Sequence, residues 1–252
     1  MDTSGELRLA VLIDADNIPY AHIKEMMEEV AKYGNPTFKR IYGDWTKPNL
    51  SGWKNVLLLN AITPVQQYGY TTGKNSTDSA MIIDAMDILY TGRVDGFCIV
   101  SSDSDFTRLA TRLREAGMKV FGIGEKKTPI SFISACNKFI YIEILSKKEK
   151  EEESKLSKKE KHILNKEETI VKVDKGLISL ISSSVIDLAD EAGWTFLGEL
   201  GGLLGKKHPD FDPRNYGFKT LLPLIKSLNK FEIDERETGR GKIKHVYVRT
   251  KE

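Results

Sequence analysis

Residues 9–17 read LAVLIDADN and residues 96–106 read GFCIVSSDSDF. Both stretches open with an apolar run of the kind that forms a strand buried on both faces of a parallel sheet. Each run leads directly to carboxylates, Asp14 in the first stretch and Asp103 and Asp105 in the second. Because ligands of open α/β sheets bind outside the carboxyl ends of the strands, we expect these side chains to meet at one edge of the sheet.

A cluster of carboxylates at a sheet edge predicts a site for a divalent metal ion. Mg²⁺ and Mn²⁺ prefer oxygen ligands, and unpaired carboxylates repel one another unless a cation or protons offset their charge. No Lys or Arg directly adjoins either acidic run. The alternative is that each Asp only caps the helix that follows it, but caps need not come as doublets at two separate strand ends.

The composition limits the classes of protein to which the chain can belong. Its 252 residues, 40% hydrophobic and 29% charged, suit a soluble globular protein with one large domain or two modest ones. No apolar stretch is long enough to cross a bilayer, so we expect a cytoplasmic protein without a membrane partner. Cys98 and Cys136 lack the spacing of metal ligands and the histidines are scattered, so any chemistry is left to carboxylates.

The pattern from residue 7 to residue 143 alternates apolar strands with amphipathic helices, which predicts an α/β fold with a mostly parallel sheet flanked by helices. The expected strands span residues 8–14, 37–42, 63–68, 96–101, 119–124 and 138–143. The expected helices span residues 20–32, 53–61, 77–90, 105–116 and 130–135. Asp78 then lies in the first turn of a helix, where it either joins the acidic set or only offsets the helix dipole.

Residues 147–168 form a charged segment with eight lysines, seven glutamates and few apolar residues. We interpret it as a semi-rigid linker, because Lys and Glu at this spacing support transient helix. The formal net charge of the whole chain, +2, is too small to indicate nucleic-acid binding. Any such binding must therefore come from local patches of basic residues.

The sequence changes character from about residue 169. The expected elements are helices over 177–188 and 215–229, a short helix between them, and strands over 231–234 and 245–248. Three helices followed by a β-hairpin predict a small C-terminal winged-helix domain.

Three motifs, taken in order, resemble the NYN domain, a family that includes LabA-like proteins and belongs to the PIN-like nucleases. The motifs are VLIDADN at 11–17, KNSTD at 74–78 and VSSDSDF at 100–106, and the resemblance spans roughly residues 7–145. It implies a PIN-like fold and metal-dependent ribonuclease chemistry, with Mg²⁺ or Mn²⁺ as the cofactor. The catalytic and metal-binding residues that it implies are Asp14, Asp78, Asp103 and Asp105.

Other residues of these motifs are candidates for substrate contacts or structural roles. Asn17 matches an Asn of the family and is expected to orient a ligand or phosphate. Lys74 is either a phosphate contact or a solvated loop lysine. Asp84 also matches a family position, but six residues after Asp78 it points to another side of the helix, so we expect a structural role. Ser102 stands where the family often has Gly, which is a mild departure.

The C-terminal region resembles the OST-HTH, or LOTUS, domain, which is associated with RNA binding. The resemblance lies in residues 193–197, 208–218 and 246–249 and covers about residues 170–250. It makes basic residues candidate RNA contacts, with a solvated surface as the alternative: Arg214, Lys219, Arg240 and Lys242, together with Lys206, Lys207 and Lys244. We expect the aromatic residues to lie in the core: Trp194, Phe196, Phe211, Tyr216 and Phe218.

The favoured hypothesis is a metal-dependent endoribonuclease with a nuclease domain over 1–146, a linker over 147–168 and an RNA-binding domain over 169–252. RNA is the expected partner, the second domain serves RNA or a protein partner, and the sequence indicates no oligomeric state. One alternative is a non-catalytic RNA-binding or adaptor protein with a vestigial acidic pocket. Another is a haloacid-dehalogenase-type phosphatase with Asp14 as nucleophile, which Ile18 disfavours because those enzymes usually have a Thr-type residue there.

Overall fold

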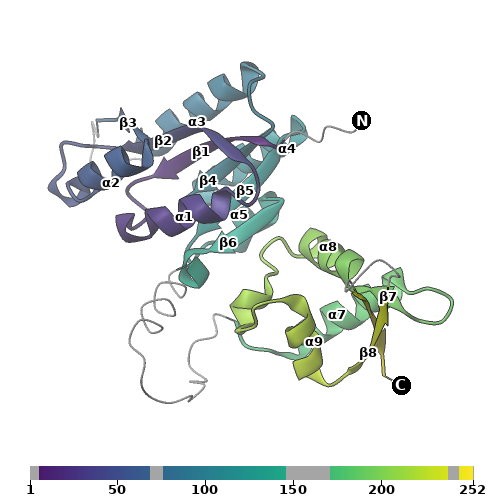
Figure 1. Cartoon of the computed structure of the whole chain (residues 1–252). Helices are drawn as coiled ribbons and strands as arrows, with labels where there is room; N and C mark the ends of the chain where they lie inside the picture. The colour runs from purple at the N-terminus through teal and green to yellow at the C-terminus, as the bar shows by residue number, and fades with distance from the viewer. Residues whose placement is uncertain (1–5, 69–75, 146–170, 238–243, 252) are drawn as a thin grey trace, which may run out of the picture. The chain divides into compact units, whose positions relative to one another are not determined.

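The computed structural model describes residues 6–68, 76–145, 171–237 and 244–251. It divides the chain into two compact units, residues 1–158 and residues 159–252 (Figure 1). Among the described residues, no helix is both long enough and apolar enough to span a membrane.

A parallel sheet forms the centre of the first unit (Figure 1). Within the described residues it has six strands in the order β3-β2-β1-β4-β5-β6, and every neighbouring pair is parallel. The strands are β1 Arg8–Asp14, β2 Asn35–Gly43, β3 Thr63–Gln66, β4 Gly96–Val100, β5 Lys119–Gly124 and β6 Lys138–Tyr141. The prediction of a mostly parallel α/β sheet is confirmed.

Helices connect successive strands, because parallel neighbours need a crossover connection. They are α1 Ile23–Val30, α2 Trp53–Asn60, α3 Ser76–Tyr90, α4 Thr107–Glu115 and α5 Ile130–Ala135. Helix α3 packs against β1 and β2, and α4 packs against β5 and α5. Each helix lies close to its expected range, although the first is shorter because Tyr20–His22 forms a 3-10 turn.

Strands β1 and β4 are neighbours at the centre of the sheet, and Ile13 pairs with Val100. From β1 the chain first builds the sheet outward on one side, through β2 and β3, and then on the other, through β4 to β6. In open α/β sheets, ligands bind at such a topological switch point. Residues 9–14 and all of β4 are buried, which explains why their sequences are apolar.

The second unit consists of helices packed against a small antiparallel sheet of order β7-β9-β8. Its described elements are α7 Lys175–Leu188, β7 Thr195–Phe196, α8 Leu197–Lys207, α9 Leu221–Leu228, β8 Phe231–Glu237 and β9 Lys244–Thr250. The core joins side chains from the three helices to Phe231 of β8 and Val248 of β9. This is the small domain of helices and a hairpin that the sequence predicts.

The expected helix over 215–229 is wrong in its first half. Pro213–Tyr216 forms a separate 3-10 turn, and Gly217 ends it with a left-handed φ of 83°. The α-helix begins only after Thr220, whose backbone is extended. The apolar spacing continued through the turn because Tyr216 and Phe218 also pack against the core, so periodicity alone did not mark the break.

The expectation that all five aromatic residues lie in the core is also wrong in part. Phe211 is buried in the core, and Tyr216 and Phe218 pack against it. Trp194 and Phe196 belong to neither group, because Thr195 between them is the residue that points inward and is buried. Alternation along β7 therefore places Phe196 on the other face of the sheet. Trp194 precedes the strand, and its ring lies beside Arg236 and Arg249.

Close packing at the end of β5 predicts a cost for Gly124→Ala. A Cβ there would lie 2.6 Å from the backbone oxygen of Ser101 and 2.8 Å from Oγ1 of Thr128. We expect a loss of about 1–3 kcal/mol in the free energy of unfolding, measured by urea denaturation. The control Gly202→Ala adds a methyl group where nothing lies within 4 Å, and it should be neutral or stabilising. Equal stability of the two variants would contradict this prediction.

Candidate functional site

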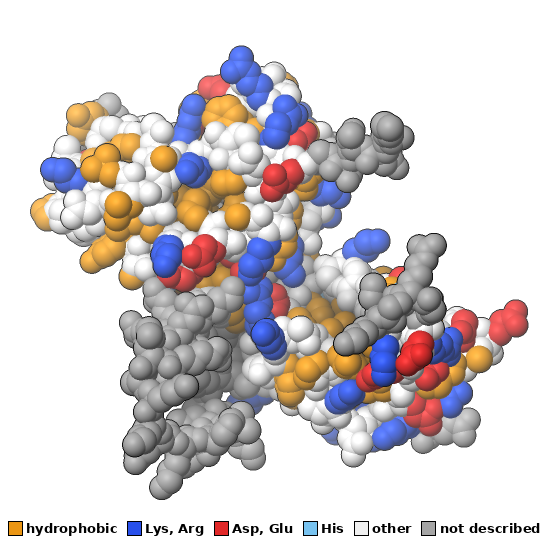
Figure 2. All heavy atoms as spheres, in the orientation of Figure 1, with side chains coloured by type: hydrophobic (Ala, Val, Ile, Leu, Met, Phe, Trp, Pro, Cys, Tyr) orange, Lys and Arg blue, Asp and Glu red, His pale blue; other side chains and the backbone are white. Residues whose placement is uncertain are grey.

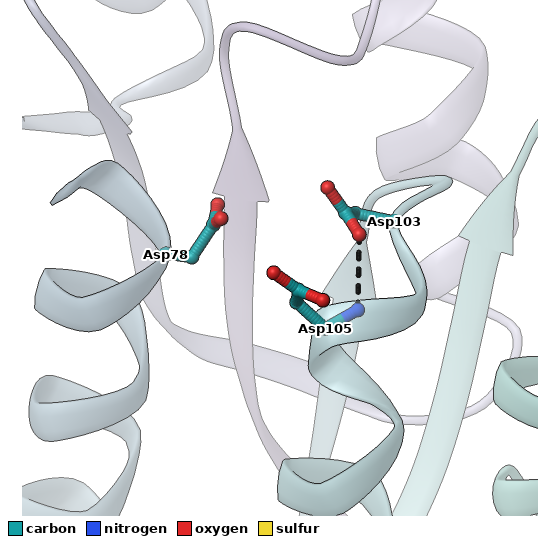
Figure 3. A group of neighbouring side chains, drawn as sticks. All are labelled: Asp78, Asp103 and Asp105. Carbon is teal, nitrogen blue, oxygen red and sulfur yellow. Dashed lines mark hydrogen bonds between the residues drawn. The ribbon is translucent and has the colours of Figure 1, made fainter. Parts of the chain in front are cut away.

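Three carboxylates converge at the switch point of the first unit. One oxygen from each of Asp78, Asp103 and Asp105 lies within 4.8 Å of the other two (Figure 3). Asp78 comes from the first turn of α3, and Asp103 and Asp105 come from the 3-10 turn that follows β4. Figure 3 shows the three side chains directed toward a shared space. The convergence of acids from two separate segments is therefore present in the folded chain.

Asp103 also caps the turn in which it lies. Its Oδ1 accepts a hydrogen bond of 2.9 Å from the backbone N–H of Asp105. Capping and clustering are compatible, because a carboxylate has two oxygens and more than one acceptor position on each. The capping bond fixes the direction of the side chain before any ligand binds.

Asp14 lies at the end of β1 and is only 1% exposed. Its carboxylate accepts hydrogen bonds from Nδ2 of Asn17 at 2.6 Å, from Oγ of Ser101 at 2.9 Å and from the backbone N–H of Asp16 at 3.1 Å. Burial raises the pKa of Asp14, and the bonds from Asn17 and Ser101 oppose that rise. Asp14 is not one of the three residues that converge within 4.8 Å.

The electrostatic state of Asp78 reflects the other acids. Burial is the largest cause that raises the pKa of Asp78 to about 6, and the charge of Asp14 is the next largest. The charges of Asp103, Asp105 and Asp16 raise it further. The negative charges of Asp14 and Asp16 therefore raise the pKa of Asp78, although neither residue is one of the three that converge.

The donor set fits a hard divalent cation. All three side chains offer carboxylate oxygens, which are the ligands that Mg²⁺ and Mn²⁺ prefer. Oxygens bound to one Mg²⁺ ion at about 2.1 Å are at most about 4.2 Å apart, so a closing movement of less than about 1 Å brings the three into range. A cation would also offset the repulsion that raises the pKa of Asp78.

Ser101 is a residue of the site that the sequence reasoning missed. Its hydroxyl donates to Asp14, and the same oxygen accepts the backbone N–H of Asp103 at 3.1 Å. It therefore joins the ends of β1 and β4. The sequence could have indicated this role, because Ser101 stands between a buried strand and the acidic run that contains Asp103. Asn17, predicted to orient a ligand, donates its amide to Asp14 and thus orients that carboxylate.

Asp84 has the structural surroundings that we expected. It forms an ion pair with Arg40 and accepts a hydrogen bond from the hydroxyl of Tyr42. Both partners belong to β2, so these contacts fix α3 against the sheet. Asp78 lies near the first residue of the same helix. The contacts of Asp84 with β2, which lie outside the acidic cluster, therefore also fix the helix that carries Asp78.

The candidate RNA contacts of the second unit differ in their surroundings. Arg214 donates to Asp212 through Nε at 2.9 Å and Nη2 at 2.7 Å, so its guanidinium is engaged within the fold. Lys219 is exposed. Lys74, Arg240 and Lys242 lie outside the described residues.

Comparisons with known proteins match both parts of the chain. A model of the NYN domain family matches residues 8–143, and a model of the OST-HTH/LOTUS domain matches residues 168–243. An uncharacterized protein of Methanocaldococcus jannaschii is 25% identical over 124 residues, which is 48% of each chain. The present chain thus spans about half the length of that relative.

Solved structures also resemble parts of the chain. A protein of unknown function from Vibrio parahaemolyticus covers 56% of this chain and 96% of its own, with 19% identity and a TM-score of 0.48. An uncharacterized protein of Nitrosomonas europaea covers 38% of this chain and 92% of its own, with 29% identity and a TM-score of 0.30.

The pKa of Asp78 predicts a pH-dependent effect of Asp78→Asn. The folded pKa of about 6 lies above the ordinary value of 3.8, so the protonated side chain favours folding and that contribution is lost as the pH rises through 6. In metal-free protein we expect Asp78→Asn to raise the free energy of unfolding at pH 7 by on the order of 1 kcal/mol, and to change it little at pH 4 or below. Urea denaturation at both pH values measures this difference.

The matched control is Asp87→Asn, because Asp87 is an exposed carboxylate on the same helix. It should give no gain that depends on pH. If Asp78→Asn and Asp87→Asn behave alike, the acids around Asp78 do not repel it as the geometry indicates.

Proposed function

This chain belongs to the NYN domain family, whose model matches residues 8–143, and on that premise we propose that it is a metal-dependent endoribonuclease. The observation that carries the proposal is the convergence of Asp78, Asp103 and Asp105 at the topological switch point of the sheet. The OST-HTH/LOTUS match supports a role for the second unit in binding the RNA.

In this proposal Asp78, Asp103 and Asp105 hold Mg²⁺ or Mn²⁺, and Asp14 adds a fixed negative charge beside them. A bound divalent cation supplies an activated water and offsets the charge of the phosphate during hydrolysis. The chain's own residues prepare the site: Ser101 and Asn17 orient Asp14, and the capping bond orients Asp103. A proton and the cation compete for Asp78, so metal affinity should fall as the pH drops below about 6.

The surroundings of Cys98, Cys136 and Asp14 argue against a mechanism in which one of these side chains attacks the substrate. Cys98 and Cys136 are buried, and burial raises the pKa of both thiols, so neither is a reactive thiolate. Asp14 is almost fully buried and accepts three hydrogen bonds. Those contacts favour an orienting and electrostatic role over the attacking role that a haloacid-dehalogenase-type phosphatase would require.

We expect cleavage of RNA in Mg²⁺ or Mn²⁺ and none in excess EDTA. Asp103→Asn should lower the rate by about two orders of magnitude or more, because the amide loses the charge that holds the metal. The fold should survive, since Asn is as good a helix cap as Asp. Gel analysis of labelled RNA and DNA, each with metal or with chelator, measures both effects.

Asp87→Asn again serves as the control and should cleave like the unmodified protein. Equal cleavage in metal and in EDTA would exclude the metal mechanism. Absence of cleavage in every metal, with RNA binding retained, would favour the alternative of an RNA-binding or adaptor protein with a vestigial pocket.

The proposed division of labour assigns catalysis to residues 1–146 and RNA capture to residues 169–252, with 147–168 as a linker. A fragment that ends near residue 146 should retain cleavage and bind RNA more weakly than the full chain. Each Lys or Arg that neutralises a phosphate releases counterions, so the affinity of the full chain should fall more steeply with salt. Binding curves for both proteins at several salt concentrations test this, and identical affinities and slopes would assign the second unit to a protein partner.

A further inference from the structure

One face of the small sheet in the second unit carries a row of aromatic rings and guanidinium groups. Thr195 of β7 and Val248 of β9 are fully buried and point into the core. Because side chains alternate along a strand, their neighbours point to the opposite face. We call the rings and guanidinium groups of this opposite face the stacking face: Phe196, Arg236, His245, Tyr247 and Arg249, together with Trp194, which precedes β7 and contacts the two arginines. Glu232 and Asp234 lie on the same face.

The rings of this face contact one another. The centroid of Phe196 lies 5.2 Å from that of His245 and 5.7 Å from that of Tyr247. These distances fall in the range of favourable aromatic pairs. Phe196 and Tyr247 are half-buried, and neither is part of the hydrophobic core cluster. The side of an antiparallel sheet that faces away from the core is ordinarily polar, so a row of half-buried rings is unusual there.

The guanidinium groups extend the row. Arg236 lies over the ring of Tyr247 at 4.0 Å and near that of Trp194 at 5.7 Å. Arg249 lies over the ring of Trp194 at 4.7 Å. Rings and guanidinium planes therefore form one continuous row across the three strands.

Carboxylates hold these cations in place and offset their charge. Nε of Arg236 donates to Asp234 at 2.8 Å, and Nε of Arg249 donates to Glu232 at 3.0 Å. The two guanidinium charges of the stacking face are thus matched by two neighbouring carboxylates. In the view of Figure 2, basic and acidic side chains of the second unit are likewise interspersed instead of gathered by sign.

We propose that the stacking face binds the unpaired bases of single-stranded RNA, an inference that rests on the proposed RNA-binding role of the second unit. Unpaired bases stack on aromatic rings and on arginine planes, and both surfaces are present here. A face whose charges are balanced suits uncharged bases better than phosphates. At one edge of the row, an open hollow is lined by Glu232, Arg249 and Lys251 and by Val185 and Ile186 of α7.

If the stacking face binds bases, removing one of its rings should lower the affinity for single-stranded RNA but not for duplex RNA, and the loss should be the same at every salt concentration. The test uses the full chain in EDTA, so that cleavage plays no part, and measures fluorescence anisotropy of a short unstructured RNA and of the same sequence as a duplex. Tyr247→Leu and Trp194→Leu should each weaken single-strand binding by about 5-fold to 100-fold, the effect of losing a stacked base. Duplex binding should change little, and the slope of affinity against salt should stay the same because no phosphate contact is lost.

Two variants serve as controls. Tyr247→Phe keeps the ring and should bind like the unmodified chain. Tyr90→Leu removes a tyrosine that is 74% exposed on the first unit and should have no effect. Circular dichroism checks that each variant is folded, and Trp194→Leu carries the test if Tyr247→Leu is not.

The outcomes separate this inference from the proposed function. If the unmodified chain binds RNA and both folded leucine variants bind it equally well, the proposal that the stacking face binds bases is wrong. The face would then be assigned to a protein partner. Equal losses for single-stranded and duplex RNA, or a changed salt slope, would also overturn the proposal. If the unmodified chain binds no RNA in EDTA, it is the RNA-binding role of the second unit that fails. Cleavage assays in metal test the nuclease proposal independently of all these results.

Discussion

The parallel pairing of β1 with β4 is the constraint on which the candidate site depends. Both strands are buried, and their register sets Ile13 beside Val100, so the residues that follow them emerge together. Ser101 then links the two strand ends through one hydroxyl, which donates to Asp14 and accepts from the backbone of Asp103. A buried carboxylate without partners would be costly, and these hydrogen bonds offset much of that cost. The position of Asp14 is therefore a consequence of strand pairing.

Helix α3 shows how the same fold treats two carboxylates differently. Asp84 has Arg40 and Tyr42 as partners, so its charge contributes to the attachment of the helix to β2. Asp78 lies six residues earlier, where burial and the charges of neighbouring acids raise its pKa to about 6. The paired residue fixes the helix, and the fixed helix holds the other carboxylate where repulsion would otherwise move it. Such a separation of supporting contacts from a strained group is typical of functional sites, where stability is given up locally.

The sequence was sufficient to predict the buried strands and the acidic residues at their ends. The apolar runs before Asp14 and Asp103 located two strands, and because these strands are parallel neighbours, the acids that follow them lie at the same edge of the sheet. Asp14 is nevertheless outside the group of three that converges. Ser101 was missed because its role depends on contacts with Asp14 and with the backbone of Asp103. The contact with Asp14 exists only when β1 and β4 are neighbours in the folded sheet. The helix over 215–229 was overextended because Gly217 can end a helix or lie within one, and only the folded backbone decides. Trp194 and Phe196 were placed in the core because an aromatic side chain is usually buried. The sequence does not show that Thr195, and not the ring on either side of it, is the residue that points into the core.

An acidic site repels the phosphates on which it is proposed to act, which bears on how such a protein can hold RNA. Until a cation binds, the charges of Asp14, Asp78, Asp103 and Asp105 oppose the approach of a polyanion. Contacts between lysines and phosphates offset this repulsion, but salt weakens them because they depend on the release of counterions. Stacking of bases on a face with balanced charge needs no net positive potential and persists when salt screens exposed charges. Joining such a face to the acidic site in one chain raises the local concentration of RNA at that site without any new contact, provided that the connection can span the distance. The near-neutral composition of the chain is therefore compatible with RNA as the substrate, since the affinity can come from bases while the charge of the site is reserved for the metal.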